Sequence, residues 1–331
     1  MIYRQLGASG PEVSAIGFGA WQIGDPAYWG ANDEADAQRT VDTALDAGVT
    51  LFDTAEMYGQ GESERVLGRA LGARRGRVFV ASKVWPSHCR PDLLEAACEA
   101  SLSRLGTDYL DLYQVHWAPR DVPFSEVTGA LERLRGAGKI RHFGISNFGV
   151  RDMQTWFATG DCVSNQLGYN LLFRAIELEI LPACFQRGIG VLAYMPLMQG
   201  LLAGRWTSAE EVPMSRRRTR HFSALREGTR HGEAGCETET FEVLRAIQRI
   251  AQNAGAPTSS VALAWVMAQT GVSSVIVGAR RPEQLAANLD ATRLHLSADV
   301  LQALHEATAP LRDRLGANAD MWLAGSDSRI R

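Results

Sequence analysis

The sequence has few cysteines, and no two of them have the spacing of a known disulfide or zinc-binding motif. There are five among 331 residues, an odd number, widely scattered and without a Cys-x-x-Cys pair. This pattern does not fit a disulfide framework or the usual zinc-binding spacings, so we expect reduced thiols and no bound metal. The five are Cys89, Cys98, Cys162, Cys184 and Cys236.

The sequence also lacks an excess of charge of either sign. It holds 34 Lys plus Arg against 37 Asp plus Glu, a formal net charge of -3. A nucleic-acid-binding surface needs a clear basic excess, so the balance argues against that class of protein. The densest basic run consists of Arg216, Arg217, Arg218 and Arg220, and we interpret it as part of a solvated loop.

Long hydrophobic runs are absent as well. No stretch reaches the roughly 20 consecutive apolar residues that cross a bilayer. The N-terminal residues lack the charged, then apolar, then small-residue order of a secretory signal. Because 46% of all residues are hydrophobic, the chain can still bury a large core. We therefore expect a cytoplasmic globular protein with no membrane and no nucleic-acid partner.

Short apolar runs alternate with amphipathic stretches along the chain, which predicts βαβ units and a parallel sheet. The length allows two domains or one closed barrel. Eight alternations favour a single (β/α)₈ TIM-barrel domain over 1–331 rather than an open doubly wound sheet. The predicted strands are 14–19, 49–54, 77–84, 109–116, 142–147, 162–170, 190–196 and 273–279, and the predicted helices are 33–47, 63–71, 90–105, 125–137, 150–158, 176–186, 239–254 and 282–289.

Four segments fall outside this alternation. Residues 1–16 predict a β-hairpin that plugs one end of the barrel. The stretch 199–238, after the seventh strand, is rich in Arg, Ser and Gly, and a loop of that length is either functional or disordered. The apolar stretch 259–269 predicts an extra buried helix. Residues 292–331 form a C-terminal helix and tail, from which Trp322 could fold over the barrel mouth.

Polar residues close several of the predicted strands, where a barrel of this kind places its catalytic groups. Asp53, Lys83 and His116 each end an apolar run, and Tyr58 follows the second strand. Tyr58 then acts as a proton donor whose pKa the Lys83 ammonium lowers, while Asp53 holds the lysine. His116 binds a carbonyl oxygen or joins the proton path. The structural alternatives are a buried Asp53–Lys83 ion pair and a core histidine.

These residues resemble the aldo-keto reductase superfamily, from about Tyr3 to Ala291. The segment FDTAEMYGQGESE is similar to the family's Asp-Thr-Ala-x-x-Tyr-Gly-x-x-Glu signature, and Asp53, Tyr58, Lys83 and His116 match its catalytic tetrad. The sequence most resembles bacterial members and the branch that includes potassium-channel β subunits. By this resemblance, the residues that contact the nicotinamide cofactor are Gly19, Ala20, Trp21, Asp53, Ser146, Asn147, Gln166, Tyr194, Pro196, Leu197, Gly200 and Arg205.

The segment VGARRPEQLAAN follows the eighth strand and opens a helix, where backbone N–H groups favour phosphate. Gly278 permits close approach of the backbone to the phosphate. Arg280 can bind a 2′-phosphate through the parallel N–H donors of its guanidinium. The resemblance adds Gln284 and Asn288 at the adenine end and favours NADPH over NADH. No Gly-x-Gly-x-x-Gly motif follows the first strand, so a Rossmann site is unsupported.

Two positions depart from the family pattern. Ala20 stands where a hydroxyl residue is common, and Met195 stands where a serine is common. We expect both to alter cofactor contacts without removing the chemistry.

The substrate pocket is expected to include Trp21, Tyr58, Trp85, His116 and Trp117, although the tryptophans could simply pack the barrel rim. The resemblance implies reduction of an aldehyde or ketone, possibly sugar-derived, with NADPH. Two alternatives are a sugar or polyol dehydrogenase running the reverse reaction, and a cofactor-binding regulatory subunit without turnover. The sequence does not determine the substrate or the oligomeric state.

Overall fold

Eight parallel strands close into a barrel in the computed structural model, which describes residues 1–31 and 33–331. Each strand overlaps one of the eight predicted runs, so the predicted fold class is confirmed. The chain order of the strands is also their order around the barrel, and the last strand pairs with the first. The strands are β3 (Ile16–Gly19), β4 (Leu51–Asp53), β5 (Phe79–Val84), β6 (Leu110–Val115), β7 (Ile140–Ser146), β8 (Ser164–Gly168), β9 (Gly190–Tyr194) and β10 (Val272–Gly278).

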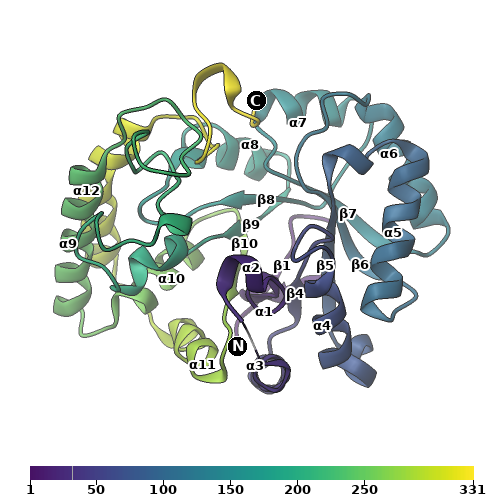
Figure 1. Cartoon of the computed structure of the whole chain (residues 1–331), viewed down its shortest axis with the longest axis horizontal. Helices are drawn as coiled ribbons and strands as arrows, with labels where there is room; N and C mark the ends of the chain where they lie inside the picture. Colours follow the sequence, from purple (N-terminus) through teal and green to yellow (C-terminus); the bar gives the residue numbers. More distant parts are fainter. Residues whose placement is uncertain (32) are drawn as a thin grey trace.

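Helices surround the barrel and cover its outer face (Figure 1). Their apolar sides bury against the strands, which are themselves buried over almost their whole length. The helices between strands are α1 (Trp21–Gly24), α2 (Pro26–Trp29), α3 (Glu34–Asp46), α4 (Glu62–Leu71), α5 (Pro91–Leu105), α6 (Phe124–Gly136), α7 (Val150–Phe157), α8 (Ile180–Gln186), α9 (Glu237–Asn253) and α10 (Thr258–Met267), and α11 (Pro282–Leu289) and α12 (Ala298–Leu315) follow β10.

The helix predicted over 176–186 is the one that differs in kind. A 3₁₀ turn over Ala175–Glu177 is followed by a separate helix, α8. Pro182 explains the break, because its ring would collide with the carbonyl of Leu178 in a continuous helix. In the first turn of α8 the same proline is tolerated.

The N-terminal hairpin closes the end of the barrel where the strands begin. Strands β1 (Tyr3–Gln5) and β2 (Glu12–Ser14) pair antiparallel. Leu6, which follows β1, and Val13, within β2, are fully buried in one cluster with residues of the barrel strands. The backbone N–H of Ala8 donates to the Gly188 carbonyl at 2.7 Å. At Gly7, where φ is +66°, an added Cβ would lie 2.5 Å from that same oxygen. The predicted N-terminal hairpin is therefore confirmed.

The segments after β9 and β10 reach the opposite end of the barrel. Helix α10 is buried from residue 260 to residue 267, as expected for the apolar stretch, and α12 packs against α9.

The solvated-loop interpretation of the arginine run is wrong for Arg220, which is buried and ion-paired with Glu233. In the part of the chain that the structure describes, no helix is both long and apolar enough to span a membrane.

Candidate functional site

A cavity of about 800 Å³ opens at the carboxyl ends of the barrel strands. Every residue predicted for catalysis, cofactor binding or the substrate pocket lines it, with the exceptions of Ala20 and Lys83. Ala20 is fully buried, and its backbone N–H donates to the Asp53 carbonyl at 2.8 Å, so it supports the cavity wall from behind. Lys83 lies beneath the floor, completely buried.

Three members of the predicted tetrad, Asp53, Tyr58 and Lys83, are joined by hydrogen bonds. The Lys83 ammonium donates to Asp53 Oδ1 at 2.6 Å, to the Thr54 carbonyl at 2.8 Å and to the Tyr58 hydroxyl at 3.2 Å. Asp53 Oδ2 accepts a further bond from Gln166 Nε2 at 2.8 Å. The buried ion pair therefore exists, and it also extends to a hydroxyl that faces the cavity.

Burial sets the protonation states of this group. Desolvation raises the pKa of Tyr58 more than the Lys83 charge lowers it, with Asp53 adding to the rise. Lys83 therefore lowers this pKa, as predicted, but the burial of the hydroxyl outweighs that effect, and the net shift is upward. Burial also lowers the pKa of Lys83, but Asp53 and Tyr58 together raise it above its ordinary value. Tyr58 is thus a neutral phenol beside an ammonium group at neutral pH.

His116 lies next to Tyr58 in the cavity. The two rings meet edge to face with centroids 5.7 Å apart, and Trp85 and His116 also meet edge to face, with centroids 5.2 Å apart. Burial, with the charges of Lys83 and Arg329, holds the pKa of His116 well below its usual range. The imidazole is therefore neutral at physiological pH, with one N–H to donate.

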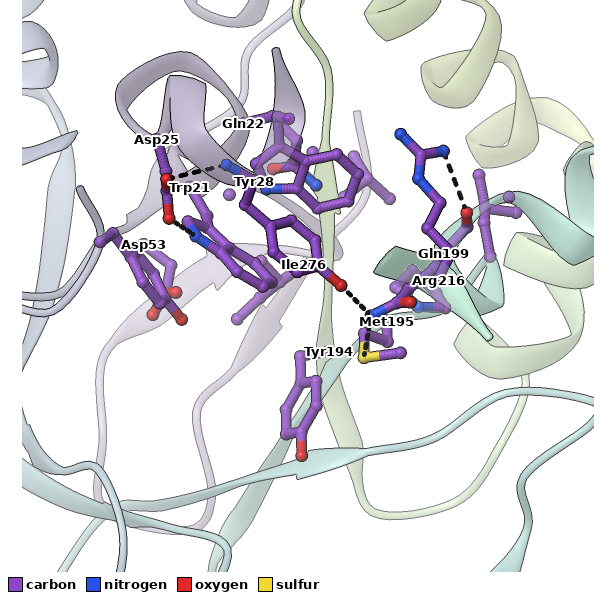
Figure 2. Close-up of a pocket in the computed structure, with 18 of the residues that line it drawn as sticks. Trp21, Gln22, Asp25, Tyr28, Asp53, Tyr194, Met195, Gln199, Arg216 and Ile276 are labelled. Carbon is purple, nitrogen blue, oxygen red and sulfur yellow. Dashed lines mark hydrogen bonds between the residues drawn. The ribbon is translucent and has the colours of Figure 1, made fainter. Parts of the chain in front are cut away.

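Trp21 forms part of the cavity wall, beside Tyr28 of the short helix α2 (Figure 2). Its ring stacks on Tyr58 at 5.3 Å and on Tyr28 at 4.7 Å, and its indole N–H donates to Asp25 Oδ2 at 2.8 Å. The Tyr28 hydroxyl accepts a bond from Gln199 Nε2 at 3.1 Å. These contacts join the segment after β3 to the segment after β9.

Amide and hydroxyl side chains form the floor beside the tetrad. The backbone of Asn147 is in the left-handed region, with φ of +60°. Its side-chain Nδ2 donates to the His116 carbonyl at 3.1 Å. Its Oδ1 accepts from the Tyr194 hydroxyl at 2.8 Å. Ser146 and Gln166 lie next to it, almost fully buried. These predicted cofactor-binding residues are therefore brought together, and their orientation is fixed by bonds among themselves.

The opposite end of the cavity is basic. Arg205, Arg216, Arg218, Arg230 and Arg280 all line it. Arg216 lies over the Trp29 ring at 5.0 Å and Arg280 donates to the Trp29 carbonyl, so these two guanidinium groups are near one another. Burial, with the charges of Arg205 and Arg280, lowers the pKa of Arg216. Such a cluster is costly without anions, because like charges repel.

Two features next to the basic end refine the predicted phosphate site. A Cβ on Gly278 would collide with the Gln22 amide, 1.8 Å away, so the glycine leaves room for that side chain. Gln284 Oε1 accepts from the Arg280 backbone N–H at 3.0 Å, and Arg280 Nη1 donates to the Trp29 carbonyl at 2.6 Å. These bonds hold Arg280 with its guanidinium at the cavity.

Sequence reasoning missed several lining residues. Arg216 and Arg218 are predicted in a solvated loop. Their position after the seventh predicted strand nevertheless indicates that they lie near the end of the barrel where the cavity opens. Tyr28 and Trp29 stand in an aromatic cluster after the first strand. Arg329 also lines the cavity, and no pattern in the sequence around it indicates this position. Met195, the departure noted above, lines the cavity with φ of +55°.

The structure offers no metal centre among residues 1–31 and 33–331, since no three His, Cys, Asp or Glu side chains there converge. All five cysteines lie in these ranges, and each is buried and free. Burial raises the pKa of Cys89, Cys98 and Cys184 to about 12. These thiols are therefore poor nucleophiles.

Comparison with known proteins agrees with this geometry. Residues 15–309 match the model of the aldo/keto reductase family. The chain is 34% identical to the aldo-keto reductase YhdN of Bacillus subtilis (strain 168) over 310 residues, 90% of this chain and 91% of the relative. It is 32% identical to an NADH-specific methylglyoxal reductase of Escherichia coli (strain K12) over 317 residues, 88% of this chain and 94% of the relative.

A solved structure shares both sequence and fold. An aldo/keto reductase from Klebsiella pneumoniae, in complex with NADP and acetate, is similar with a TM-score of 0.73 and 34% identity. The match covers 92% of this chain and 95% of that chain.

Proposed function

The chain belongs to the aldo/keto reductase family of oxidoreductases, and from this premise we propose that it reduces an aldehyde or ketone to the alcohol with NADPH. One observation carries the proposal. The buried Lys83 ammonium bonds at once to Asp53 Oδ1, at 2.6 Å, and to the Tyr58 hydroxyl, at 3.2 Å, and Tyr58 faces the cavity. A purely structural ion pair needs no hydroxyl at the cavity surface.

Tyr58 is the proton donor in this proposal. Its raised pKa keeps the phenol protonated before reaction. When the substrate oxygen takes that proton, the phenolate left behind accepts the hydrogen bond from Lys83, which stabilises its charge. Asp53 keeps the lysine charged and in place, so the stabilising charge is present before the proton moves.

His116 orients the substrate carbonyl. It is neutral, and it lies beside Tyr58, so its N–H can donate to the same oxygen that receives the tyrosine proton. Trp21, Trp85 and Trp117 give this end of the cavity an apolar lining that limits water.

The donor set of the cavity fits a nicotinamide dinucleotide. Ser146, Asn147 and Gln166 would hold the carboxamide, and Tyr194 lies beside them as the wall for the ring. At the other end the arginines, with the backbone at the start of α11, would hold the phosphates. The bound nicotinamide supplies the hydride that adds to the carbonyl carbon.

Several arginines at one end of the cavity support NADPH over NADH. A 2′-phosphate adds about two negative charges, and arginine binds phosphate through two parallel hydrogen bonds. Arg280 is the main candidate because its guanidinium is already held at the cavity by Trp29.

The test is consumption of NADPH by the purified protein with a panel of aldehydes, ketones and keto sugars. Tyr58→Phe should lower kcat/KM by roughly 10²- to 10⁴-fold and leave the NADPH Kd within about twofold. Tyr3→Phe is the matched control, because the Tyr3 hydroxyl bonds to Gly48 at 3.0 Å on the exposed hairpin. Turnover retained in Tyr58→Phe would refute the assignment of the donor. NADPH binding without turnover of any carbonyl, or of any alcohol with NADP⁺, would refute the reductase proposal.

A further inference from the structure

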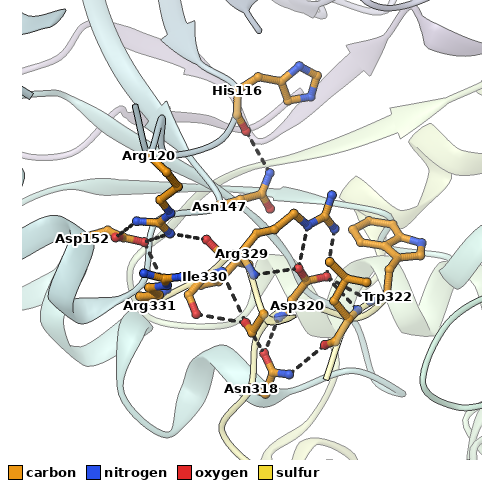
Figure 3. A network of polar contacts seen from close by, with 12 residues as sticks. His116, Arg120, Asn147, Asp152, Asn318, Asp320, Trp322, Arg329, Ile330 and Arg331 are labelled. Carbon is orange, nitrogen blue, oxygen red and sulfur yellow. Dashed lines mark hydrogen bonds and ion pairs between the residues drawn. The ribbon is translucent and has the colours of Figure 1, made fainter. Parts of the chain in front are cut away.

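Arg329, near the end of the tail, lies at the substrate side of the cavity. Its guanidinium carbon is 3.7 Å from the centre of the Trp117 ring and 5.7 Å from that of Trp322, and all three residues line the cavity with His116. Figure 3 shows the tail bringing Arg329 and Trp322 toward His116 and Asn147. The cation therefore stacks on an aromatic wall a short way from the proposed reaction centre.

Only one edge of this guanidinium is used inside the protein. Nε donates to Asp320 Oδ2 at 2.8 Å, and Nη2 donates to Asp320 Oδ1 at 2.9 Å. Asp320 is fully buried, and the backbone N–H groups of Trp322 and Leu323 hold its carboxylate at 3.0 and 3.2 Å. Among the described residues no acceptor bonds to Nη1. Since arginine has five N–H donors in a fixed plane, the edge formed by Nη1 and Nη2 can still take a second acceptor.

The tail that carries Arg329 is anchored at several points. The Arg331 backbone N–H donates to Asp152 Oδ2 at 3.0 Å, and Arg120 bonds both to Asp152 and to the Arg329 carbonyl. An arginine held in this way loses little further rotamer freedom on binding a ligand, so more of the interaction energy contributes to affinity.

Arg329 is separate from the basic end that the cofactor proposal uses. It stacks on Trp117, which follows β6, whereas Arg280 follows β10. In the order of strands around the barrel, β6 and β10 are four steps apart in a ring of eight, on opposite sides. A cofactor phosphate at Arg280 therefore leaves Arg329 available.

The cavity lining, among the described residues, offers no free carboxylate to the open edge of this guanidinium. Its only carboxylates, among the described residues, are Asp25 and Asp53. Asp25 accepts from the Trp21 indole, and Asp53 is paired with Lys83. Three tryptophans line the cavity here: Trp117 and Trp322 lie against Arg329, and Trp85 lies against His116.

We propose that Arg329 is an anion subsite that binds a carboxylate on the substrate, so that the favoured substrate is an aldehyde or ketone with a carboxylate at one end and an apolar or aromatic body. The proposal rests on the reductase function proposed above. A carboxylate matches the open edge of the guanidinium through two parallel hydrogen bonds, and the aromatic walls suit a flat spacer.

The first measurement compares 2-, 3- and 4-carboxybenzaldehyde with the corresponding methyl formylbenzoates, which are neutral and of similar shape. We expect at least one acid to exceed its ester in kcat/KM by roughly 10- to 100-fold, as for a hydrogen-bonded charge pair. Esters equal to or better than the acids at all three positions would overturn the subsite. Because ester turnover by itself reports the reductase function, that outcome leaves the function standing.

The second measurement removes the cation without leaving Asp320 as a lone buried charge. The double variant Arg329→Met with Asp320→Asn should lose the preference for the acid and keep ester turnover within about threefold. Arg329→Lys, which retains the charge but loses the planar fork, should keep only part of the preference. Arg293→Met is the control, because Arg293 is an exposed arginine paired with Asp290 at 3.1 Å. Retention of the acid preference in the double variant would refute the role of Arg329.

A binding assay covers the case in which no aldehyde is reduced. Calorimetric titration of benzoate and methyl benzoate into the protein with NADP⁺ should show tighter binding of benzoate, and the double variant should remove that difference. Equal affinities in the wild-type protein would overturn the anion subsite, whatever the fate of the reductase proposal.

Discussion

The ammonium of Lys83 donates a hydrogen bond to the hydroxyl of Tyr58 across 3.2 Å, from beneath the floor of the cavity. The lysine is fully buried, and its Nζ also lies 4.7 Å from the centre of the tyrosine ring. A buried ammonium persists only with partners, and two of them, Asp53 and the Thr54 carbonyl, belong to the end of β4. The geometry therefore gives Tyr58 a fixed positive neighbour at the point where a phenolate would form.

Lys83→Met tests this relationship. We expect kcat/KM to fall at least 10²-fold, and the free energy of unfolding to fall by about 3–5 kcal/mol, because Asp53 becomes an unpaired buried charge. Adding Asp53→Asn should restore most of the stability and none of the activity. Urea unfolding and NADPH consumption measure the two effects. An active double variant would show that the lysine charge is not needed.

The cofactor preference is tested at Arg280. Arg280→Ala should raise the Kd for NADPH at least 10-fold, since a charge-assisted bidentate contact is lost, and should change the Kd for NADH much less. Fluorescence titration with both cofactors gives the ratio, which is its own internal control for misfolding. Equal losses for both would argue against a 2′-phosphate contact at this residue.

The anchoring of the tail is tested by Gly149→Ala. An added Cβ at Gly149 would lie 2.3 Å from the Arg331 carbonyl oxygen, and the backbone there is compatible with alanine, with φ of -83°. The variant should displace the end of the tail, change the fluorescence of Trp322 and raise KM for the carbonyl substrate while the NADPH Kd stays constant. Gly136→Ala is the control, because nothing lies within 4 Å of the added carbon. Unchanged KM in Gly149→Ala would mean that the tail end does not shape the pocket.

His221 gives a pH dependence of stability. Burial lowers its pKa to about 4, and the ring lies between the Leu172 carbonyl at 2.9 Å and the Thr219 hydroxyl at 3.2 Å. The unfolded state takes up a proton near pH 6.5, and the folded state does so only near pH 4. The stabilisation from the neutral ring is therefore complete above pH 6.5 and is lost as the pH falls toward 4.

Between pH 7 and pH 5, this difference should cost the wild-type protein about 2 kcal/mol of unfolding free energy that His221→Asn does not lose. Urea unfolding of both proteins at both pH values measures it. His295→Asn, at an exposed histidine, serves as the matched control. The same loss in wild type and His221→Asn would contradict the assignment.

Much of the site followed from the sequence because a closed barrel directs the carboxyl ends of its strands to one cavity. Asp53, Lys83 and His116 are far apart in the chain, but each ends an apolar run, so the strand pattern predicts that they lie together. The protonation of Tyr58 could not be predicted in the same way. Its pKa depends on the balance between burial and the Lys83 charge, and only the packed structure fixes how far each group is from water.

The amino-acid sequence by itself determined the barrel strands, the outer helices, the N-terminal hairpin and the polar residues at the strand ends, since these depend on local periodicity and on residue type at strand ends. The tertiary structure alone decided that Arg220 is buried, that Arg216 and Arg218 line the cavity, and that the tail places Arg329 on Trp117. These positions come from long loops without periodicity. Their paths are set by contacts between residues far apart in the chain, such as Arg331 with Asp152, which no local pattern encodes.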